Sequence, residues 1–359
     1  MTSGPDFERV LAALRREEPD RVPLGEFLVD PPAKEAFLGK HVGDSLIRAD
    51  EYDVAADVEF WHTAGYDYMH LAPNYLGLFE GGWNIQESDY SVYDDGPVQK
   101  AWMEEHTSVL RTPQDVAEYP WPSAQDVDLS DIVRAGELLP EGMMLTSGTW
   151  GIFETTRQLV GFEAALMAIY DRPGFLESVL ERVGTFLFEL FQRVVQLPKV
   201  GAVWFADDLA SIDTYFVNPD WYRANLFPWM RKYGEVAASK GLPLIYHCDG
   251  NIWDVLPDVV DCGFSALQPI EPKAMDIVEV KRQYGGHLCV IGNIDLGGCL
   301  TMGTPEQVAD EVRTRIREVA PGGGYIVGSS NSVTNYVPLD NYKAMLQATL
   351  KWGRYPISA

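Results

Sequence analysis

The segment Leu244-Ile-Tyr-His-Cys-Asp-Gly250 is the most informative part of this chain. A short apolar run ends abruptly in a histidine, a thiol and a carboxylate, followed by a glycine that favours a turn. Polar groups are costly inside a core, so this change at the end of a buried strand is typical of the rim of an active site. The same pattern recurs along the chain.

Short apolar runs alternate with longer amphipathic segments, which is typical of parallel strands joined by helices. The predicted strands are Val22–Phe27, Asp67–Leu71, Met143–Ser147, Ala202–Asp207, Pro243–His247, Ser265–Ile270, Leu288–Ile291 and Tyr325–Gly328. The predicted helices are Phe7–Arg16, Glu51–Ala64, Phe175–Val195, Trp221–Lys240, Ala274–Tyr284, Pro305–Val319 and Leu339–Lys351. We therefore predict an α/β fold, a (β/α)8 TIM barrel preceded by an N-terminal helix.

We predict a single domain over residues 1–359, with an excursion at 74–141 between the second and third strands. This gap is too long for a simple crossover, and it contains a β-like run at Tyr90–Tyr93, the turn Asp94-Asp-Gly96 and a second run at Val98–Met103. Such a pattern predicts a β-hairpin. The excursion either covers the barrel mouth or forms a surface decoration with its own small core.

Composition excludes some classes of protein. The formal charge is −25, from 28 basic and 53 acidic side chains, and no cluster of Lys and Arg offers a cationic surface for nucleic acid. No apolar run is long enough to cross a bilayer, and Met1–Arg9 lacks the pattern of a secretory signal. The 4 cysteines do not suggest a disulfide framework. We expect a cytoplasmic protein with no membrane or nucleic-acid partner.

His247 and Asp249 form the strongest candidate site, because working groups of such barrels lie at the carboxyl ends of the strands. At a spacing of two, both side chains can face one pocket, either as metal ligands or as an acid–base pair. Cys248, between them, is an alternative soft ligand. Asp207 and Asp208 end the fourth strand, and only one of them can face the lumen. We predict a catalytic role for Asp207, although an aspartate there can also cap a turn.

The remaining predicted site residues are expected to bind substrate. Trp150 and Phe153, with aromatic residues of the excursion, would form an apolar wall. Polar groups of the substrate would be bound by Ser147, Gln268, Asn293, Ser330 and Asn331. A lone histidine such as His70 is more often a satisfied core residue than a catalytic one.

Several motifs, spread in order over nearly the whole chain, resemble those of the uroporphyrinogen decarboxylase superfamily, which implies a (β/α)8 barrel. They are Phe7-Glu-Arg-Val-Leu-Ala-Ala-Leu-Arg-Arg-Glu-Glu-Pro-Asp-Arg-Val-Pro23, Tyr119-Pro-Trp-Pro122, His247-Cys-Asp-Gly250, Ile291-Gly-Asn-Ile-Asp295, Gly303-Thr-Pro-Glu306, Gly323-Gly-Tyr-Ile-Val-Gly-Ser-Ser-Asn331 and Pro338-Leu-Asp-Asn341.

The superfamily has two main branches, and this chain departs from both. The decarboxylase branch places arginines after the first strand, whereas Gly25–Glu35 has one lysine, three acids and no arginine. The methyltransferase branch uses a His-x-Cys-Gly motif and a late cysteine to hold zinc. Here Asp249 replaces the first cysteine and Asn331 stands at the position of the second. A harder set of ligands would favour oxygen chemistry over thiolate chemistry.

The resemblance implies a methyltransferase that moves a methyl group between a small methoxylated or related donor and the corrinoid of a partner protein. His247, or zinc or another divalent metal held by His247 and Asp249, would polarise or protonate the leaving oxygen. Asp207 would orient the donor or set the protonation state of His247. A homodimer is a family-level expectation. The alternatives are a decarboxylase of a small carboxylic acid and a non-catalytic binding protein on the same barrel.

Overall fold

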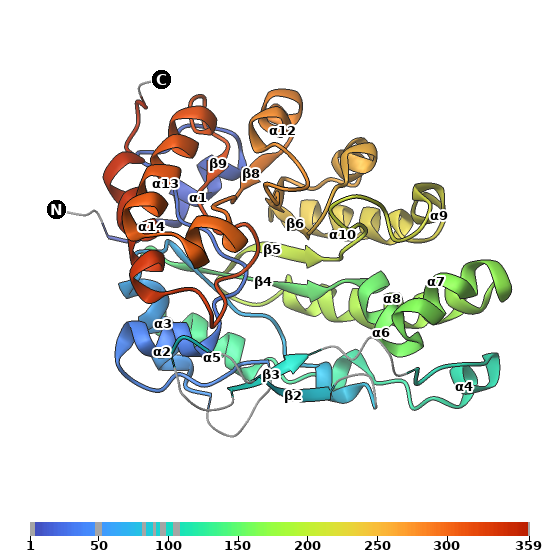
Figure 1. Ribbon diagram of the computed structural model, residues 1–359. Coiled ribbons are helices and arrows are strands. Elements are labelled where there is room, and N and C mark those ends of the chain that lie inside the picture. The colour runs from blue at the N-terminus through green and yellow to red at the C-terminus, as the bar shows by residue number, and fades with distance from the viewer. Residues whose placement is uncertain are drawn as a thin grey trace.

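The computed structural model describes residues 4–46, 52–80, 84–88, 91–93, 98–102 and 108–357. Its centre is a sheet of seven parallel strands in the order β1-β4-β5-β6-β7-β8-β9, which curls inside a layer of helices (Figure 1). The strands are β1 Tyr68–His70, β4 Met144–Trp150, β5 Val200–Ala206, β6 Leu244–Cys248, β7 Ala266–Pro269, β8 Cys289–Ile291 and β9 Tyr325–Ile326. The predicted TIM-barrel-like α/β fold is confirmed.

The first predicted strand, Val22–Phe27, is reduced to isolated bridges. Leu24 pairs with Val327 and Val29 with Val333, both in the parallel sense. Pro23 lacks an N–H and contributes only its carbonyl, which accepts from Val327 N at 3.0 Å. The segment therefore lies beside β9 without forming a regular strand.

Helices surround the sheet, most of them on its outer side (Figure 1). They are α1 Phe7–Leu14, α2 Pro31–Leu38, α3 Val54–Thr63, α4 Pro113–Glu118, α5 Ser130–Leu138, α6 Ile152–Val160, α7 Phe162–Asp171, α8 Phe175–Val194, α9 Pro219–Asn225, α10 Phe227–Ser239, α11 Leu256–Asp261, α12 Ile277–Tyr284, α13 Pro305–Val319 and α14 Leu339–Trp352. All seven predicted helices are present, with one correction. The segment predicted as Trp221–Lys240 forms two helices, because Pro228 suits the first turn of a new helix and not the interior of a long one.

The barrel has two apolar layers, one inside the lumen and one between the sheet and the helices. The lumen cluster contains Trp204, Ala206 and Ile245, while their neighbours along the strands belong to the outer layer. Helix α1 also belongs to the lumen cluster and closes the amino end of the barrel. Gly201 accommodates this helix, because a Cβ there would lie 2.4 Å from the Phe7 ring.

The excursion contains the predicted hairpin, with its first strand earlier than expected. Strand β2, Asn84–Ser88, pairs antiparallel with β3, Val98–Trp102. Tyr93 lies in a bend instead of a strand, and the predicted turn at 94–96 is outside the described residues. Val92 N donates to Asn335 O at 3.0 Å, beyond β9, so this part of the excursion reaches the carboxyl rim. None of the helices in the described ranges is long and apolar enough to span a membrane.

Glu26 is a fully buried carboxyl group beside the irregular first segment. Its oxygens accept from Ser329 N and Ser329 Oγ, both at 2.7 Å. Burial raises the pKa of Glu26 to about 8, so the folded protein keeps this group protonated at pH values where the unfolded chain ionises it. Stability should therefore fall as pH rises from about 5 to about 8, by up to ~1.4 kcal/mol per pH unit from this residue.

We expect Glu26→Gln to remove this pH dependence and to raise stability at pH 8 by about 2–4 kcal/mol, with little change at pH 5. Urea unfolding of both proteins at several pH values measures the difference. Glu163→Gln, on an exposed surface, is the matched control. If the free energy of unfolding changes with pH in the same way in wild type and Glu26→Gln, Glu26 is ionised in the folded protein.

Candidate active site

Strand β6 presents His247 to the lumen. Ile245, two residues earlier, belongs to the lumen cluster, and side chains of a strand alternate between its faces. The ring of Phe27 stacks on His247 with 4.5 Å between centroids and 25° between planes. His247 is only 8% exposed, and this burial lowers the pKa of its imidazole.

The hydrogen bonds of Gln268 define the tautomer of His247. Gln268 Nε2 donates to Asn331 O at 3.0 Å, which leaves Gln268 Oε1 as the acceptor facing His247 Nδ1. His247 Nδ1 therefore carries the proton, and the lone pair of Nε2 points away from Gln268. Nε2 lies 4.0 Å from Asp249 Oδ1. The strand pair β6–β7, which places His247 opposite Gln268, builds this arrangement.

Three side chains at the ends of β5 and β6 can hold a cation together. One ligand atom from each of Asp208, His247 and Asp249 lies within 4.8 Å of the others. Asp208 Oδ1 accepts from Asp249 N at 2.8 Å, which ties the two segments together. Asn331 Nδ2 donates to Asp249 Oδ2, whereas Asp249 Oδ1 is buried without a hydrogen-bond partner. We call Asp208, His247 and Asp249 the rim cluster.

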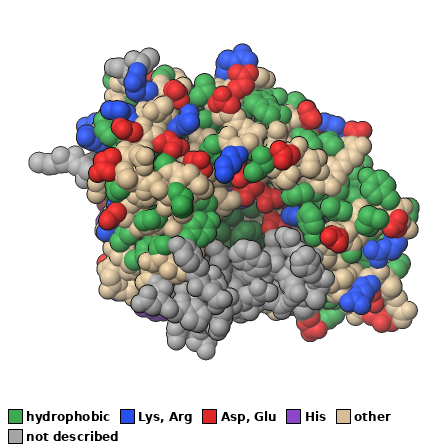
Figure 2. All heavy atoms as spheres, viewed as in Figure 1, with side chains coloured by type: hydrophobic (Ala, Val, Ile, Leu, Met, Phe, Trp, Pro, Cys, Tyr) green, Lys and Arg blue, Asp and Glu red, His purple; other side chains and the backbone are tan. Residues whose placement is uncertain are grey.

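The surroundings of the rim cluster are acidic. Glu271 Oε2 accepts from Gly250 N at 2.8 Å, which places a further carboxylate beside the turn after β6. Burial, with repulsion from Asp208 and Glu271, raises the pKa of Asp249 well above its usual value. Figure 2 shows acidic side chains around the recess near the centre of the viewed face. A cation would relieve this repulsion.

Asp207 does not join the rim cluster, which corrects the predicted placement. Its Oδ2 and Oδ1 accept from Phe153 N and Glu154 N, each at 2.9 Å, at the start of α6. Gly151 allows this close approach, because a Cβ there would lie 2.2 Å from Asp207 Cγ. Asp207 therefore satisfies the free N–H groups at the start of α6. Asp208, and not Asp207, lies beside His247 and Asp249.

Three other predicted residues also face the helices. Ser147 lies between Leu145 and Thr149 on the outer face of β4, where Thr149 Oγ1 contacts Tyr233 of α10. Phe153 is fully buried against Trp221 and Tyr222. Cys248 follows His247 on the opposite face of β6 and is not part of the rim cluster. The structure therefore does not bring these three side chains to the predicted pocket.

The remaining predicted residues divide between the site and its supports. Gln268 and Asn331 contact the rim cluster as described above, and Trp150 packs edge-on against Phe27 at 5.5 Å. Ser330 Oγ accepts from Leu296 N at 2.9 Å, and Asn293 Nδ2 donates to Ile270 O at 3.0 Å, so both order neighbouring loops. The prediction missed Phe27, whose ring covers His247, because nothing in its sequence context distinguishes it from a core residue.

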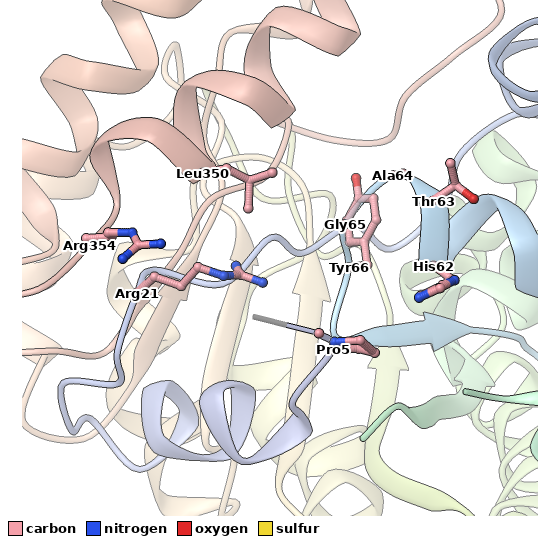
Figure 3. Close-up of a pocket in the computed structure, with 10 residues that line it drawn as sticks. Pro5, Arg21, His62, Thr63, Ala64, Gly65, Tyr66, Leu350 and Arg354 are labelled. Atoms are coloured by element: carbon pink, nitrogen blue, oxygen red, sulfur yellow. The ribbon is translucent and has the colours of Figure 1, made fainter. Parts of the chain in front are cut away.

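A cavity of about 360 Å³ lies near the amino ends of the strands, away from the rim cluster. Figure 3 shows Arg21 and Arg354 approaching it from neighbouring segments and His62 from the end of α3. No member of the rim cluster lines this cavity. We therefore place the chemistry at the carboxyl rim.

Fold and site together define a TIM-barrel-like protein with a histidine–carboxylate centre at its carboxyl rim. The model of the uroporphyrinogen decarboxylase (URO-D) family matches residues 101–352, and the chain belongs to this family. The resemblance predicted from the sequence motifs is confirmed.

The curated relatives are methyltransferases. The chain is 25% identical over 212 residues to a methylcobamide:CoM methyltransferase MtaA of Methanosarcina barkeri, which covers 54% of this chain and 60% of that protein. It is 26% identical over 175 residues to a methylated-thiol–coenzyme M methyltransferase of Methanosarcina mazei, covering 47% and 44% of the two chains. These matches agree with the predicted methyltransferase branch. The chain thus spans about 60% of the length of the first of these relatives.

A solved structure of a methyltransferase from Methanosarcina mazei has the same fold. It superposes with a TM-score of 0.71 at 20% identity, over 95% of this chain and 97% of that one. The likeness therefore extends over the whole barrel.

The rim cluster fits a divalent cation with oxygen and nitrogen ligands. Zinc is bound by histidine nitrogen and carboxylate oxygen, and catalytic zinc sites use three protein ligands with one position open. Such an ion would give Asp249 Oδ1 a binding partner and would offset the negative charge of the carboxylates. The rim cluster contains no thiol: Asp249 and Asn331 stand at the two positions where the resemblance implies cysteines, and Cys248 lies on the other face of β6.

Proposed function

We propose that this protein transfers a methyl group between a small methoxylated donor, or a related one, and the corrinoid of a partner protein. The observation that carries the proposal is the rim cluster, in a chain with a curated relative that is named a methylcobamide:CoM methyltransferase. Its oxygen-rich ligands suit a donor that leaves through oxygen, whereas a thiol acceptor would suit sulfur ligands.

The chemistry requires stabilisation of the leaving oxygen. When a methyl ether gives up its methyl group, the electron pair of the C–O bond remains on oxygen, which then needs a proton or a nearby positive charge. A divalent cation held by Asp208, His247 and Asp249 would supply that charge as a Lewis acid. The corrinoid would supply the nucleophile that accepts the methyl group.

The residues of the chain hold the reacting groups in place. Gln268 fixes the His247 ring so that the Nε2 lone pair faces Asp249. Phe27 covers one face of the ring. Asn331 holds Asp249 by one oxygen and leaves the other available. Such support of ligand orientation commonly affects metal affinity and rate by 10- to 100-fold.

The test combines metal analysis with a methylation assay. The purified protein is analysed for bound metal and then incubated with methoxylated compounds and reduced corrinoid, with corrinoid methylation followed by absorbance. We expect turnover that is lost with a chelator and restored by a divalent cation. Cys248→Ser should retain both metal and turnover, because its thiol lies outside the rim cluster.

Other outcomes would replace the proposal. Release of CO2 from a small acid in the absence of corrinoid would identify a decarboxylase. Binding of small molecules without metal or turnover would identify a non-catalytic protein on the same barrel. Loss of metal in Cys248→Ser would assign a thiol ligand and contradict the oxygen-rich site. The homodimer stays a prediction.

A further inference from the structure

The cavity at the amino end of the barrel has a positively charged lining. Its volume of about 360 Å³ is within the range of small-molecule sites. Its described lining residues include Arg21, Arg354 and His62 but no aspartate or glutamate, although acidic side chains outnumber basic ones 53 to 28 in the chain. Figure 3 shows both arginines extending from one side of the cavity and His62 pointing toward it from the other. This lining favours an anionic ligand.

The backbone places the two arginines directly opposite each other. Arg21 and Arg354 form an isolated antiparallel bridge. Two backbone hydrogen bonds flank this pair: Val22 N to Gly353 O at 2.8 Å, and Tyr355 N to Asp20 O at 3.1 Å. Opposite residues of an antiparallel pair extend their side chains on the same face, and like charges so placed repel each other. The fold therefore holds two cations at one wall of the cavity.

Nearby carboxylates balance only one of these two cations. Asp67 pairs with Arg21 and also with Arg9, whose second partner is Asp20. Two carboxylates thus neutralise two guanidinium groups. The guanidinium of Arg354 has no ion pair or hydrogen bond with any residue that the structure describes. An anion in the cavity would supply its missing counter-charge.

Several hydrogen-bond donors of the lining are also available. Arg21 donates from Nη1 to Val22 O and from Nη2 to Asp67, which leaves its Nε–H without a protein partner. The His62 imidazole likewise has no partner within the described ranges. A phosphate group has several anionic oxygens and can accept from donors on different sides, and arginine binds it through paired N–H groups.

The end of helix α3 also lines the cavity, and free carbonyls at a helix end would disfavour an anion. Here the following turn satisfies two of these carbonyls. Trp61 O accepts from Tyr66 N, and His62 O accepts from Gly65 N, both at 3.1 Å. The repulsion from α3 is therefore reduced.

We propose that this cavity binds a small organic phosphate through Arg354, Arg21 and His62, at a site separate from the rim cluster. Pro5 and Leu350 also line the cavity and would contact the organic part of the ligand, because the volume is larger than a phosphate group alone would fill. The ligand would neutralise Arg354 and hold together the two segments that carry the arginines. Binding there requires no methyl transfer.

The first test locates the ligand by observing His62 directly. Protein labelled with ¹⁵N-histidine is titrated with phenyl phosphate at constant ionic strength, and His62→Gln assigns the signal. We expect a saturable shift of the His62 signal and no such shift of His247, which belongs to the rim cluster. Inorganic phosphate should give a similar shift with weaker binding, because it lacks the apolar contact with Leu350.

The second test measures affinity by isothermal titration calorimetry. Arg354→Gln should weaken the binding of phenyl phosphate by about 10-fold or more, because it removes charged hydrogen-bond donors. Arg354 is exposed, so this variant should fold. Arg182→Gln is the matched control, because Arg182 is an exposed residue of α8 outside the cavity, and it should bind as wild type does.

The third test compares the free energy of unfolding with and without the ligand. Without phenyl phosphate, Arg354→Gln should be at least as stable as wild type, because it removes the repulsion between the two opposite arginines. With saturating phenyl phosphate, wild type should be the more stable, because a ligand that binds only the folded state stabilises it by mass action. Urea unfolding measures both differences.

Three results would overturn the proposal. The first is the absence of a saturable response of His62, or equal affinity of wild type and Arg354→Gln for phenyl phosphate. The second is a shift confined to His247, which would place the phosphate at the rim cluster. The third is tighter binding of benzoate than of phenyl phosphate, which would show that the cavity selects a carboxylate. None of these measurements depends on the proposed methyl transfer.

Discussion

His247→Ala is expected to slow corrinoid methylation by about a thousandfold while the barrel stays folded. The imidazole is the only nitrogen ligand of the rim cluster, and Gln268 holds its Nε2 lone pair toward Asp249. Its removal should also reduce the metal content of the purified protein. The rate and bound metal of the variant are compared with wild type, and circular dichroism checks the fold.

His287→Ala is the control for this change, because His287 is exposed in the turn before β8 and outside the rim cluster. It should keep both rate and metal. If His247→Ala retains most of the wild-type rate, the imidazole has no part in the reaction and the rim cluster is not the active site.

The neighbours Asp207 and Asp208 should give opposite results when each is replaced by asparagine. Asp207→Asn should destabilise the protein by about 1–3 kcal/mol, because an amide cannot accept from both Phe153 N and Glu154 N without turning one N–H toward another. Asp208→Asn should leave stability nearly unchanged and reduce the methylation rate by about 100-fold through loss of a charged ligand.

Urea unfolding and the methylation assay, applied to both variants, measure the two effects separately. The residual rate of Asp207→Asn is measured at a temperature where the variant is folded. A large loss of rate in folded Asp207→Asn, together with full activity of Asp208→Asn, would restore the catalytic role first predicted for Asp207.

The sequence was sufficient for most of the fold. Apolar runs of strand length, separated by amphipathic segments, placed seven strands and seven helical segments correctly, because these periods reflect which face of each element is buried. The predicted start of the helix Pro305–Val319 is also correct, and Thr304 and Gln307 form both hydrogen bonds of a capping box there. Local chemistry also predicted that polar groups gather where strands end, and His247, Asp249, Gln268 and Asn331 do so.

The sequence could not assign faces within a strand. Parallel strands of a barrel are buried on both sides, one against the lumen and one against the helices, so both sets of residues are apolar and periodicity cannot distinguish them. The choice between Asp207 and Asp208 depends on β5 being in register with β4 and β6, and on α6 starting where Asp207 can cap it. Ser147 and Cys248 were misplaced for the same reason, whereas Phe153 lies in α6 and packs against Trp221 and Tyr222.

The chain alone thus established a barrel of parallel strands with acids and an imidazole at its carboxyl rim, because burial patterns and turn residues are local properties. Only the tertiary structure decides which of these acids lie next to the imidazole. Strand register turns Asp208 and His247 inward and Asp207 outward, and packing brings the Phe27 ring against both His247 and His70. These contacts join residues far apart in sequence, and no local pattern encodes them.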